Sequence, residues 1–218
     1  MGVPKHKFES TAHQVSIKGM LRFELKSLYG RWFYRNRAPI LDYLHIGCGP
    51  NIFTGFTNLD FYRAREARRV GGDKIFRHDL RYPLPFADDT FRGAFSEHCL
   101  EHFYPAQALA ILRETCRVLK PGGIFRCAVP DLATYVRFYN GEPVKGLEIY
   151  ESGCEAMWSL TQNWGHLSLW DAPTLTGKLL LAGFQSAEVR AFGQGENPDL
   201  LMDTPNHQWD TIYVEARK

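Results

Sequence analysis

The segment LHIGCGPNIFTGFTNLD, residues 44–60, constrains the fold of this 218-residue chain more than any other. An apolar strand leads into Gly47-Cys48-Gly49, and a short connection leads to a second strand that ends at Asp60. Glycines let the backbone approach a ligand closely, and a carboxylate at the end of the next strand can accept both hydroxyls of a ribose. The segment therefore predicts a ribose-binding site at the carboxyl ends of parallel strands.

A dinucleotide site of the NAD type is not supported by the same segment. The G-x-G-x-x-G fingerprint needs a third glycine at position 52, where the chain has Ile52. Asp60 also follows Gly49 by eleven residues, closer than the ~20 residues typical of that class.

The rest of the chain alternates short apolar runs with longer helical patterns, which is typical of a parallel sheet covered by helices. Strands are expected at residues 41–46, 57–61, 93–96, 124–129, 187–192 and 211–216. A helix is expected from near Pro105 to the turn at Pro121-Gly122-Gly123, and another from an N-cap at Asp171 to Gly183. The expected fold class is α/β.

Positive charge is concentrated at the N-terminus. Residues 1–40 carry eight Lys or Arg against two Glu, a charge of +6, which leaves −4 for residues 41–218. Apolar positions at helical spacing over residues 16–34 predict an amphipathic helix. We therefore expect a basic helical extension over residues 1–40 and one domain over residues 41–218, with the basic residues mainly forming a solvated face.

Composition excludes several classes. No apolar run approaches the ~20 residues needed to cross a bilayer, and the first forty residues lack the apolar block of a secretory signal. We expect a cytoplasmic protein without membrane contact. The five cysteines are scattered and form no C-x-x-C pair, so we expect reduced thiols, mostly in the core, rather than disulfides or a zinc ribbon.

Several ordered motifs then resemble the class I S-adenosylmethionine-dependent methyltransferases, particularly a small bacterial-type group. They are GCG, NLD and PF, followed by SEHCLEHF at residues 96–103, RVLKPGG at 117–123 and LLLAGF at 179–184. The resemblance covers residues 41–130 closely. It implies a Rossmann-like three-layer sandwich, with a seven-stranded, mostly parallel sheet whose last strand is antiparallel, and S-adenosylmethionine as cofactor.

The resemblance also implies roles for individual residues. The cofactor-binding set would be Gly47, Cys48, Gly49, Asn51, Asp60, Phe61, Asp79, Leu80 and Glu97. The glycine loop would surround the methionine part and the ribose, whose hydroxyls would bind Asp60. Phe61 would lie against the adenine, Asp79 would accept a hydrogen bond from its amino group, and the Leu80 amide would donate to the ring. Glu97 would lie near the methionine end.

Besides Asn51, which stands where the family usually has a third glycine, two positions depart from the family pattern. His45 stands where the family usually has an acidic residue that helps to hold the cofactor's amino group, and Arg92 replaces a frequent Asp. These departures keep open a third function, a catalytically silent cofactor-binding partner subunit.

Methyl transfer from a sulfonium is an in-line displacement, so the protein must align the acceptor, exclude water and, for a hydroxyl, remove a proton. His98 and His166 are the expected catalytic bases, and His102 is a weaker candidate. The set His98, Cys99 and His102 lacks a distant fourth ligand, so no metal site is expected.

Residues 131–166 form an aromatic-rich insertion that we expect to lie as a lid over one end of the sheet and to supply the acceptor pocket. Core packing is the alternative for about half of its aromatic residues. Its large side chains are Tyr135, Phe138, Tyr139, Tyr150, Met157, Trp158 and Trp164.

The expected function is O-methylation of a small molecule or saccharide. N-methylation of a small amine or an RNA is the alternative, with the basic N-terminal helix as a docking surface. Nucleic acid is the less expected acceptor, because the main domain carries −4 and no Asn-Pro-Pro-Tyr type signature follows the fourth strand. The oligomeric state is left open, with a homodimer as one option.

Overall fold

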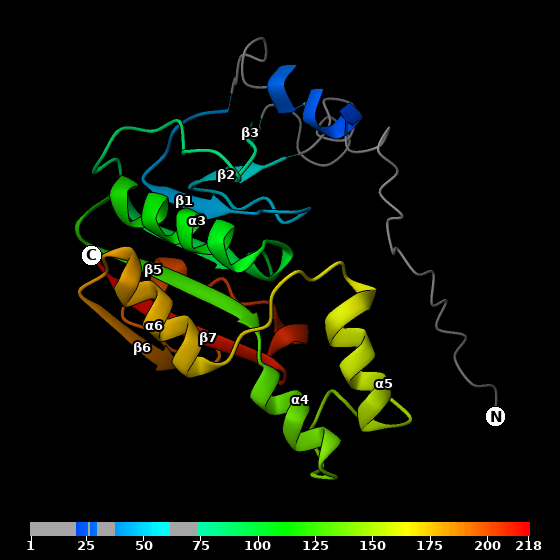
Figure 1. Cartoon of the computed structure of the whole chain (residues 1–218). Coiled ribbons are helices and arrows are strands. Elements are labelled where there is room, and N and C mark those ends of the chain that lie inside the picture. The colour runs from blue at the N-terminus through cyan, green and yellow to red at the C-terminus, as the bar shows by residue number, and fades with distance from the viewer. Residues whose placement is uncertain (1–20, 26, 30–37, 62–73) are drawn as a thin grey trace.

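The computed structural model describes residues 21–25, 27–29, 38–61 and 74–218. They form a seven-stranded sheet with the strand order β3-β2-β1-β4-β5-β7-β6 (Figure 1). The strands are β1 (Tyr43–Ile46), β2 (Phe56–Asp60), β3 (Ile75–Arg77), β4 (Phe91–Glu97), β5 (Leu119–Pro130), β6 (Ser186–Arg190) and β7 (Thr211–Arg217). β1 to β5 pair in parallel, and β7 runs antiparallel to β5 and β6. The predicted mostly parallel sheet with an antiparallel last strand is confirmed.

The six strands expected from the pattern all form, with ends shifted by a few residues. The largest shift is in β5, which begins at Leu119 rather than Ile124. The preceding helix ends at Val118, earlier than the expected stop at Pro121-Gly122-Gly123, and these three residues lie within β5. Leu119 pairs with Phe91 before the register shifts to Gly93 and Ile124. The short strand β3 was not located by the pattern, since it spans three residues only.

Two helices form where the sequence places them, α3 (Pro105–Val118) and α6 (Ala172–Ala182). The Asp171 carboxylate accepts a 2.9 Å hydrogen bond from the amide of Thr174 and so caps the first turn of α6. Gly183 ends the helix with φ 111°, a left-handed conformation that glycine adopts without strain. Both predicted ends of α6 are confirmed.

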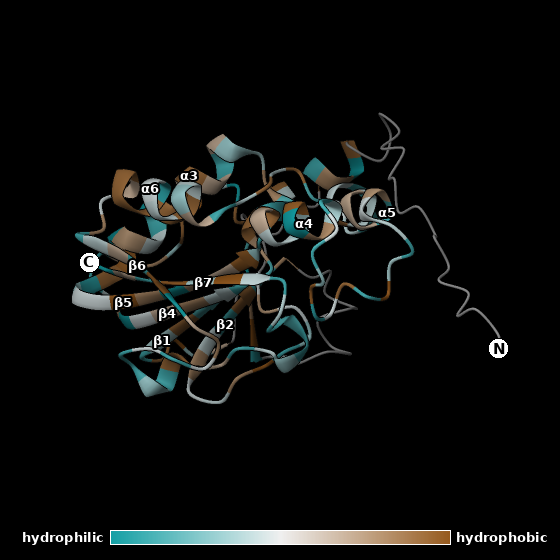
Figure 2. Cartoon of the chain, turned by 90° about the horizontal axis from the view of Figure 1, so that it is seen from below, coloured by the Kyte–Doolittle hydropathy of each residue, from teal (hydrophilic) through white to brown (hydrophobic). Residues whose placement is uncertain are grey.

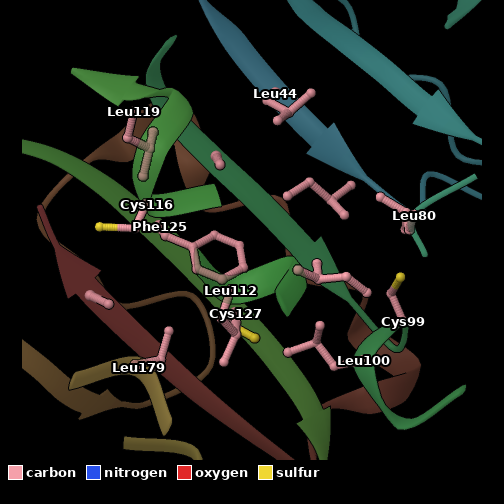
Figure 3. Close-up of a cluster of buried hydrophobic side chains, with 14 of the residues drawn as sticks. Leu44, Leu80, Cys99, Leu100, Leu112, Cys116, Leu119, Phe125, Cys127 and Leu179 are labelled. Atoms are coloured by element: carbon pink, nitrogen blue, oxygen red, sulfur yellow. The ribbon is translucent and has the colours of Figure 1, made fainter. Parts of the chain in front are cut away.

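The main core lies between the sheet and the layer formed by α3 and α6 (Figure 2). Figure 3 shows side chains from both layers meeting there, among them Leu44 of β1, Leu112 of α3, Phe125 of β5 and Leu179 of α6. Burial of each such side chain contributes about 1.5–3 kcal/mol to folding. All five cysteines are free thiols, and all except Cys154 are buried.

Neighbouring strand residues point to the opposite face of the sheet and form a second cluster. Phe56, Phe95 and Ile124 pack there with Leu200 of the short 3-10 helix η4 (Pro198–Leu200). Because both faces are covered, the central strands are apolar along most of their length.

The insertion folds into α4 (Leu132–Tyr139), α5 (Gly153–Trp158) and a π-helical turn, η3 (Ser159–Asn163), beside the ends of β5 and β7 (Figure 1). It has an apolar cluster of its own. The members among the predicted large side chains are Tyr135, Phe138, Tyr150 and Met157, whereas Tyr139, Trp158 and Trp164 are exposed. About half of the large side chains therefore serve core packing.

The described part of the N-terminal extension, residues 21–25 and 27–29, is helical. The remainder of the helix expected over residues 16–34 lies outside the described residues. Phe23, Glu24 and Ser27 contact the main domain, whereas Leu21, Leu25 and Leu28 are exposed. No helix within the described ranges has the length and apolar character needed to span a membrane.

Replacing Asp171 with Ala is expected to lower the free energy of unfolding by about 1 kcal/mol, because the amide of Thr174 loses its partner. That loss corresponds to a Tm decrease of roughly 2–4 °C in a domain of this size. Asp171→Ser is the matched control, since a serine hydroxyl can cap the same amide. Equal Tm values for the two variants would contradict the capping role.

Candidate cofactor and acceptor site

A cavity of about 540 Å³ opens where β1, β2 and β4 end. Seven residues of the predicted set line it: Gly47, Gly49, Asp60, Phe61, Asp79, Leu80 and His98. The cavity continues past Cys99 to His102 and to Leu167, which follows the insertion. It therefore joins the predicted ribose site to the predicted site of the catalytic histidines.

Asp60 organises the glycine loop. One carboxylate oxygen accepts a 2.8 Å hydrogen bond from the Gly49 amide, and the other accepts a 2.6 Å bond from the Phe61 amide. Each oxygen keeps a second lone pair for a ligand hydroxyl. Burial raises the pKa of Asp60, and the two amides partly oppose that shift. The arrangement fits a ribose with two adjacent hydroxyls.

Gly47 must be a glycine for two reasons. Its φ is +66°, and an added Cβ would lie 2.3 Å from Sγ of Cys99. The loop after β1 thus approaches the turn after β4 so closely that any larger residue would force them apart.

At the end of the cavity lined by Asp79, the carboxylate expected to bind the adenine amino group already has partners in the protein. Arg81 Nη2 donates to the Asp79 carboxylate at 2.7 Å and Ser27 Oγ at 2.6 Å. Burial raises the pKa of Asp79, but hydrogen bonds from Arg81 and Ser27 outweigh burial, and the net shift is downward. Arg81 also pairs with Glu24 at 2.6 Å, which ties the N-terminal helix to this end of the cavity.

An aromatic wall accompanies this ion pair. Phe61 lies edge-on to Phe23, with ring centroids 5.2 Å apart, and the Arg81 guanidinium lies 4.7 Å above the Phe23 ring. All three side chains line the cavity. A flat heterocycle such as adenine fits a wall of this kind.

The two positions that depart from the family pattern lie away from the cavity. His45 is buried, stacks on Phe53 with 4.3 Å between ring centroids, and contacts Asn58. Burial lowers its pKa to about 4, so it is a neutral core residue. Arg92 lies near the start of β4, where it forms an exposed pair with Asp42. Neither residue lines the cavity.

Cys48 and Asn51 shape the loop rather than line the cavity. Cys48 is buried, and its amide donates to the Leu59 carbonyl at 3.0 Å. The Asn51 amide donates to the Cys48 carbonyl, and its side chain is exposed. Both residues hold the backbone of the loop in place.

Glu97 anchors the loop before β7. Its carboxylate accepts hydrogen bonds from the amide and hydroxyl of Thr204 and faces His207. Burial raises the pKa of Glu97, but the bonds from His207 and Thr204 outweigh burial and lower it. The side chain is committed to these partners and lies outside the cavity wall.

Four ionisable groups meet at the end of the cavity lined by His98 and His102, which we call the acceptor end because the methyl acceptor is expected there. His98 Nδ1, His102 Nε2 and His166 Nε2 lie 3.9, 4.0 and 3.9 Å from Oε1 of Glu101. His98 and His102 line the cavity, and His166 lies behind them. Burial lowers the pKa of His98 to about 3 and raises that of Glu101 to about 8.

Glu101 was not among the expected site residues, although it lies between two of them in SEHCLEH. The motif predicts His98 and His102 as bases. It gives no separate indication of a role for the glutamate between them. Phe23 and Arg81 were also missed, because no local pattern reports a contact between segments more than fifty residues apart.

The comparisons with known proteins agree with this geometry. Residues 44–127 match a family model described as a methyltransferase domain. A search of curated protein sequences finds no match. The chain is similar in structure to a SAM-dependent methyltransferase from Archaeoglobus fulgidus, with TM-score 0.55, 17% identity and coverage of 89% of this chain and 94% of that one.

Two further solved structures are similar. One is an S-adenosylmethionine-dependent methyltransferase from Mesorhizobium loti, with TM-score 0.50, 18% identity and coverage of 86% of this chain and 95% of that one. The other is phosphoethanolamine N-methyltransferase 2 from Haemonchus contortus in complex with S-adenosyl-L-methionine. Its TM-score is 0.51 and its identity 14%, with coverage of 92% of this chain and 53% of that one.

The methyltransferase domain matched over residues 44–127 and the strand order, which is that of the Rossmann-like methyltransferase fold, support an S-adenosylmethionine-dependent methyltransferase. The resemblance stated from the motifs is confirmed, and with it the enzyme class and the cofactor. The residues present fit that cofactor, because Asp60 offers free lone pairs beside a loop whose glycines add no side chain to the cavity.

Asp60→Asn is expected to weaken binding of S-adenosylhomocysteine by about tenfold or more, because an uncharged amide replaces a carboxylate that accepts charge-assisted hydrogen bonds. Calorimetric titration measures the effect. Asp42→Asn, at an exposed position, is the control and should bind as the wild type does. Unchanged affinity in Asp60→Asn would remove Asp60 from the ribose site.

Arg81→Ala is expected to lower the free energy of unfolding by about 2 kcal/mol, because it leaves the Asp79 carboxylate buried without its cation. The lowered pKa of Asp79 stabilises the fold above about pH 4, and this stabilisation is lost as pH falls through that pKa. The difference between variant and wild type should therefore shrink between pH 6 and pH 3 in denaturant titrations. Arg92→Ala, which removes an exposed pair, should change stability by less than about 0.5 kcal/mol at either pH.

Proposed function

We propose that this enzyme transfers the methyl group to a hydroxyl of a small molecule or saccharide. The observation that carries the proposal is the single cavity that joins the Asp60 end to His98 and His102. A hydroxyl placed at the histidine end has the methyl donor on one side and a proton acceptor on the other.

When bound, S-adenosylmethionine supplies a methyl group on a cationic sulfur; the acceptor oxygen forms the new bond to carbon, and the electron pair of the broken sulfur–carbon bond stays on sulfur. The protein's part is to align the acceptor oxygen, exclude water and take the hydroxyl proton. His98 is the proposed proton acceptor that lines the cavity, and His166 supports the same end from behind.

A small acceptor is favoured over a nucleic acid. The domain of residues 41–218 carries a charge of −4, which repels a phosphate backbone. The cavity of about 540 Å³ is in the range of small-molecule sites, and the cofactor takes a large share of it. No residue of the insertion, residues 131–166, lines the cavity, but Leu167, which directly follows it, does. We propose that the insertion acts as a lid there.

The test is a transfer assay with S-adenosylmethionine carrying an isotopic methyl label and a panel of hydroxyl acceptors (catechols, phenols and monosaccharides) beside matched amines and a short RNA. We expect label on at least one hydroxyl compound and a loss of turnover of about a hundredfold in His98→Ala, because a general base contributes about 10²–10⁴-fold.

Binding of S-adenosylhomocysteine by His98→Ala, measured by calorimetry, should stay within about twofold of the wild type. The control Asp42→Asn, at an exposed position outside the cavity lining, should turn over as the wild type does. Transfer to amines or RNA alone would overturn O-methylation, and equal loss of cofactor binding and turnover in His98→Ala would overturn the base role.

A further inference from the structure

Glu101 is an unusual residue for a protein interior. Its side chain is 1% exposed, and neither carboxylate oxygen has a hydrogen-bond partner among the residues that the structure describes. A buried carboxylate without partners costs several kcal/mol. Protonation does not resolve the cost, because the nearest imidazole nitrogens, at 3.9–4.0 Å, are too far for a hydrogen bond.

The surrounding imidazoles present ring nitrogens to this carboxylate. Nδ1 of His166 lies 2.5 Å from the Leu160 carbonyl, which can only accept, so this nitrogen carries the proton. The neutral ring then directs the lone pair of Nε2 toward Glu101. A lone pair and a carboxyl group that face each other across 3.9 Å can both be satisfied by one group between them, either a cation or a water that donates to each.

Backbone contacts bring His166 to this place from far along the chain. The amides of Leu167 and Ser168 both donate to the Glu101 carbonyl, at 2.7 and 3.1 Å. His166 therefore joins a site that begins in the turn after β4. It is the distant ligand whose apparent lack made a metal site unexpected from the sequence.

We propose that Glu101, His102 and His166 bind a divalent first-row transition-metal cation at the acceptor end of the cavity. One ligand atom from each lies within 4.8 Å of the others. Ligand bonds of about 2.0–2.2 Å in tetrahedral geometry separate the ligand atoms by roughly 3.4 Å, so shifts of roughly 1 Å or less close the site. Hydrogen bonding of His166 to Leu160 is the outer contact that orients a metal-bound imidazole.

The donor set selects the class of cation. Two imidazoles and one carboxylate suit Mn²⁺ to Zn²⁺ in the first transition row, whereas Mg²⁺ and Ca²⁺ prefer oxygen ligands. Three protein ligands also leave a position open, as in catalytic rather than structural sites. His102 lines the cavity, and His98 lies beside it, so the open position faces the space proposed for the acceptor.

This placement gives the cation a role that rests on the proposed function. A divalent cation lowers the pKa of a hydroxyl that it contacts and fixes its orientation. The acceptor hydroxyl would then lose its proton more readily to the neutral His98 beside it. The cation would increase the rate of methyl transfer most for acceptors with two adjacent oxygen atoms, such as catechols or vicinal diols, because both atoms can reach it.

The first experiment measures metal binding alone, without cofactor or acceptor. Full-length protein is stripped with EDTA, dialysed and titrated with Co²⁺ and Zn²⁺ by calorimetry, and the visible absorption of Co²⁺ reports its coordination. We expect one equivalent per chain, weaker binding of Mg²⁺, and a loss of affinity of about tenfold or more in Glu101→Gln and His102→Ala. Asp42→Asn, which removes an exposed carboxylate outside the cavity lining, is the control and should bind as the wild type does.

His102 is exposed, so His102→Ala tests the site even if Glu101→Gln fails to fold. Melting curves of each variant establish folding, and added Zn²⁺ should raise the Tm of the wild type but not that of Glu101→Gln. Absence of saturable binding, or binding equal in wild type and both variants, would overturn the site and leave a bridging water as the partner of Glu101.

The second experiment separates the site from the reaction. Stripped enzyme should bind S-adenosylhomocysteine normally, lose methyl transfer to a hydroxyl acceptor, and regain it with Zn²⁺ or Co²⁺. Metal binding with transfer unchanged by stripping would overturn the catalytic role. Failure of transfer to every acceptor, with metal binding intact, would overturn the proposed function and the role that rests on it but not the site.

Discussion

The carboxylate of Asp60 holds together the two loops on which the cofactor end of the cavity depends. It bridges the Gly49 amide after β1 and the Phe61 amide at the end of β2. A second bond, from the Cys48 amide to the Leu59 carbonyl, fixes the same pair of loops from the backbone side. These bonds are mostly buried, and in a medium of low dielectric constant each is stronger than in water.

Backbone hydrogen bonds also hold the acceptor end of the cavity. The Glu101 carbonyl receives the amides of Leu167 and Ser168, so the segment that follows the insertion is attached to the turn after β4. The packing of the insertion therefore determines where His166 lies. The two ends of the cavity are held by different residues, which allows the acceptor end to change among related folds while the cofactor end is kept.

Local signals explain what the sequence predicted. The strands, the capped ends of α6 and the Gly-rich loop ending in Asp60 are each encoded within a few residues, and each is found. The Asp79 pairing depends on Ser27 and Glu24, more than fifty residues away, and no residue spacing reports it. His45 shows a second limit of sequence analysis. Its position two residues before Gly47 associated it with the cofactor through the family resemblance, whereas its ring packs on Phe53 in the core.

Two structural costs lie at the acceptor end, the backbone of His98 and the buried carboxyl group of Glu101. His98 has a φ of 49°, a left-handed conformation that costs a residue with a side chain about 1 kcal/mol or more. Its amide still bonds the Ala128 carbonyl, so the bend fixes the path from β4 into the turn that carries Glu101. At the Asp60 end, by contrast, every carboxylate contact described is satisfied by a backbone amide. Strain and an unpartnered buried carboxyl group persist where the surrounding structure fixes them, and such positions cluster where a protein performs chemistry. The turn from His98 to His102 is therefore better explained by what it binds than by what it contributes to folding.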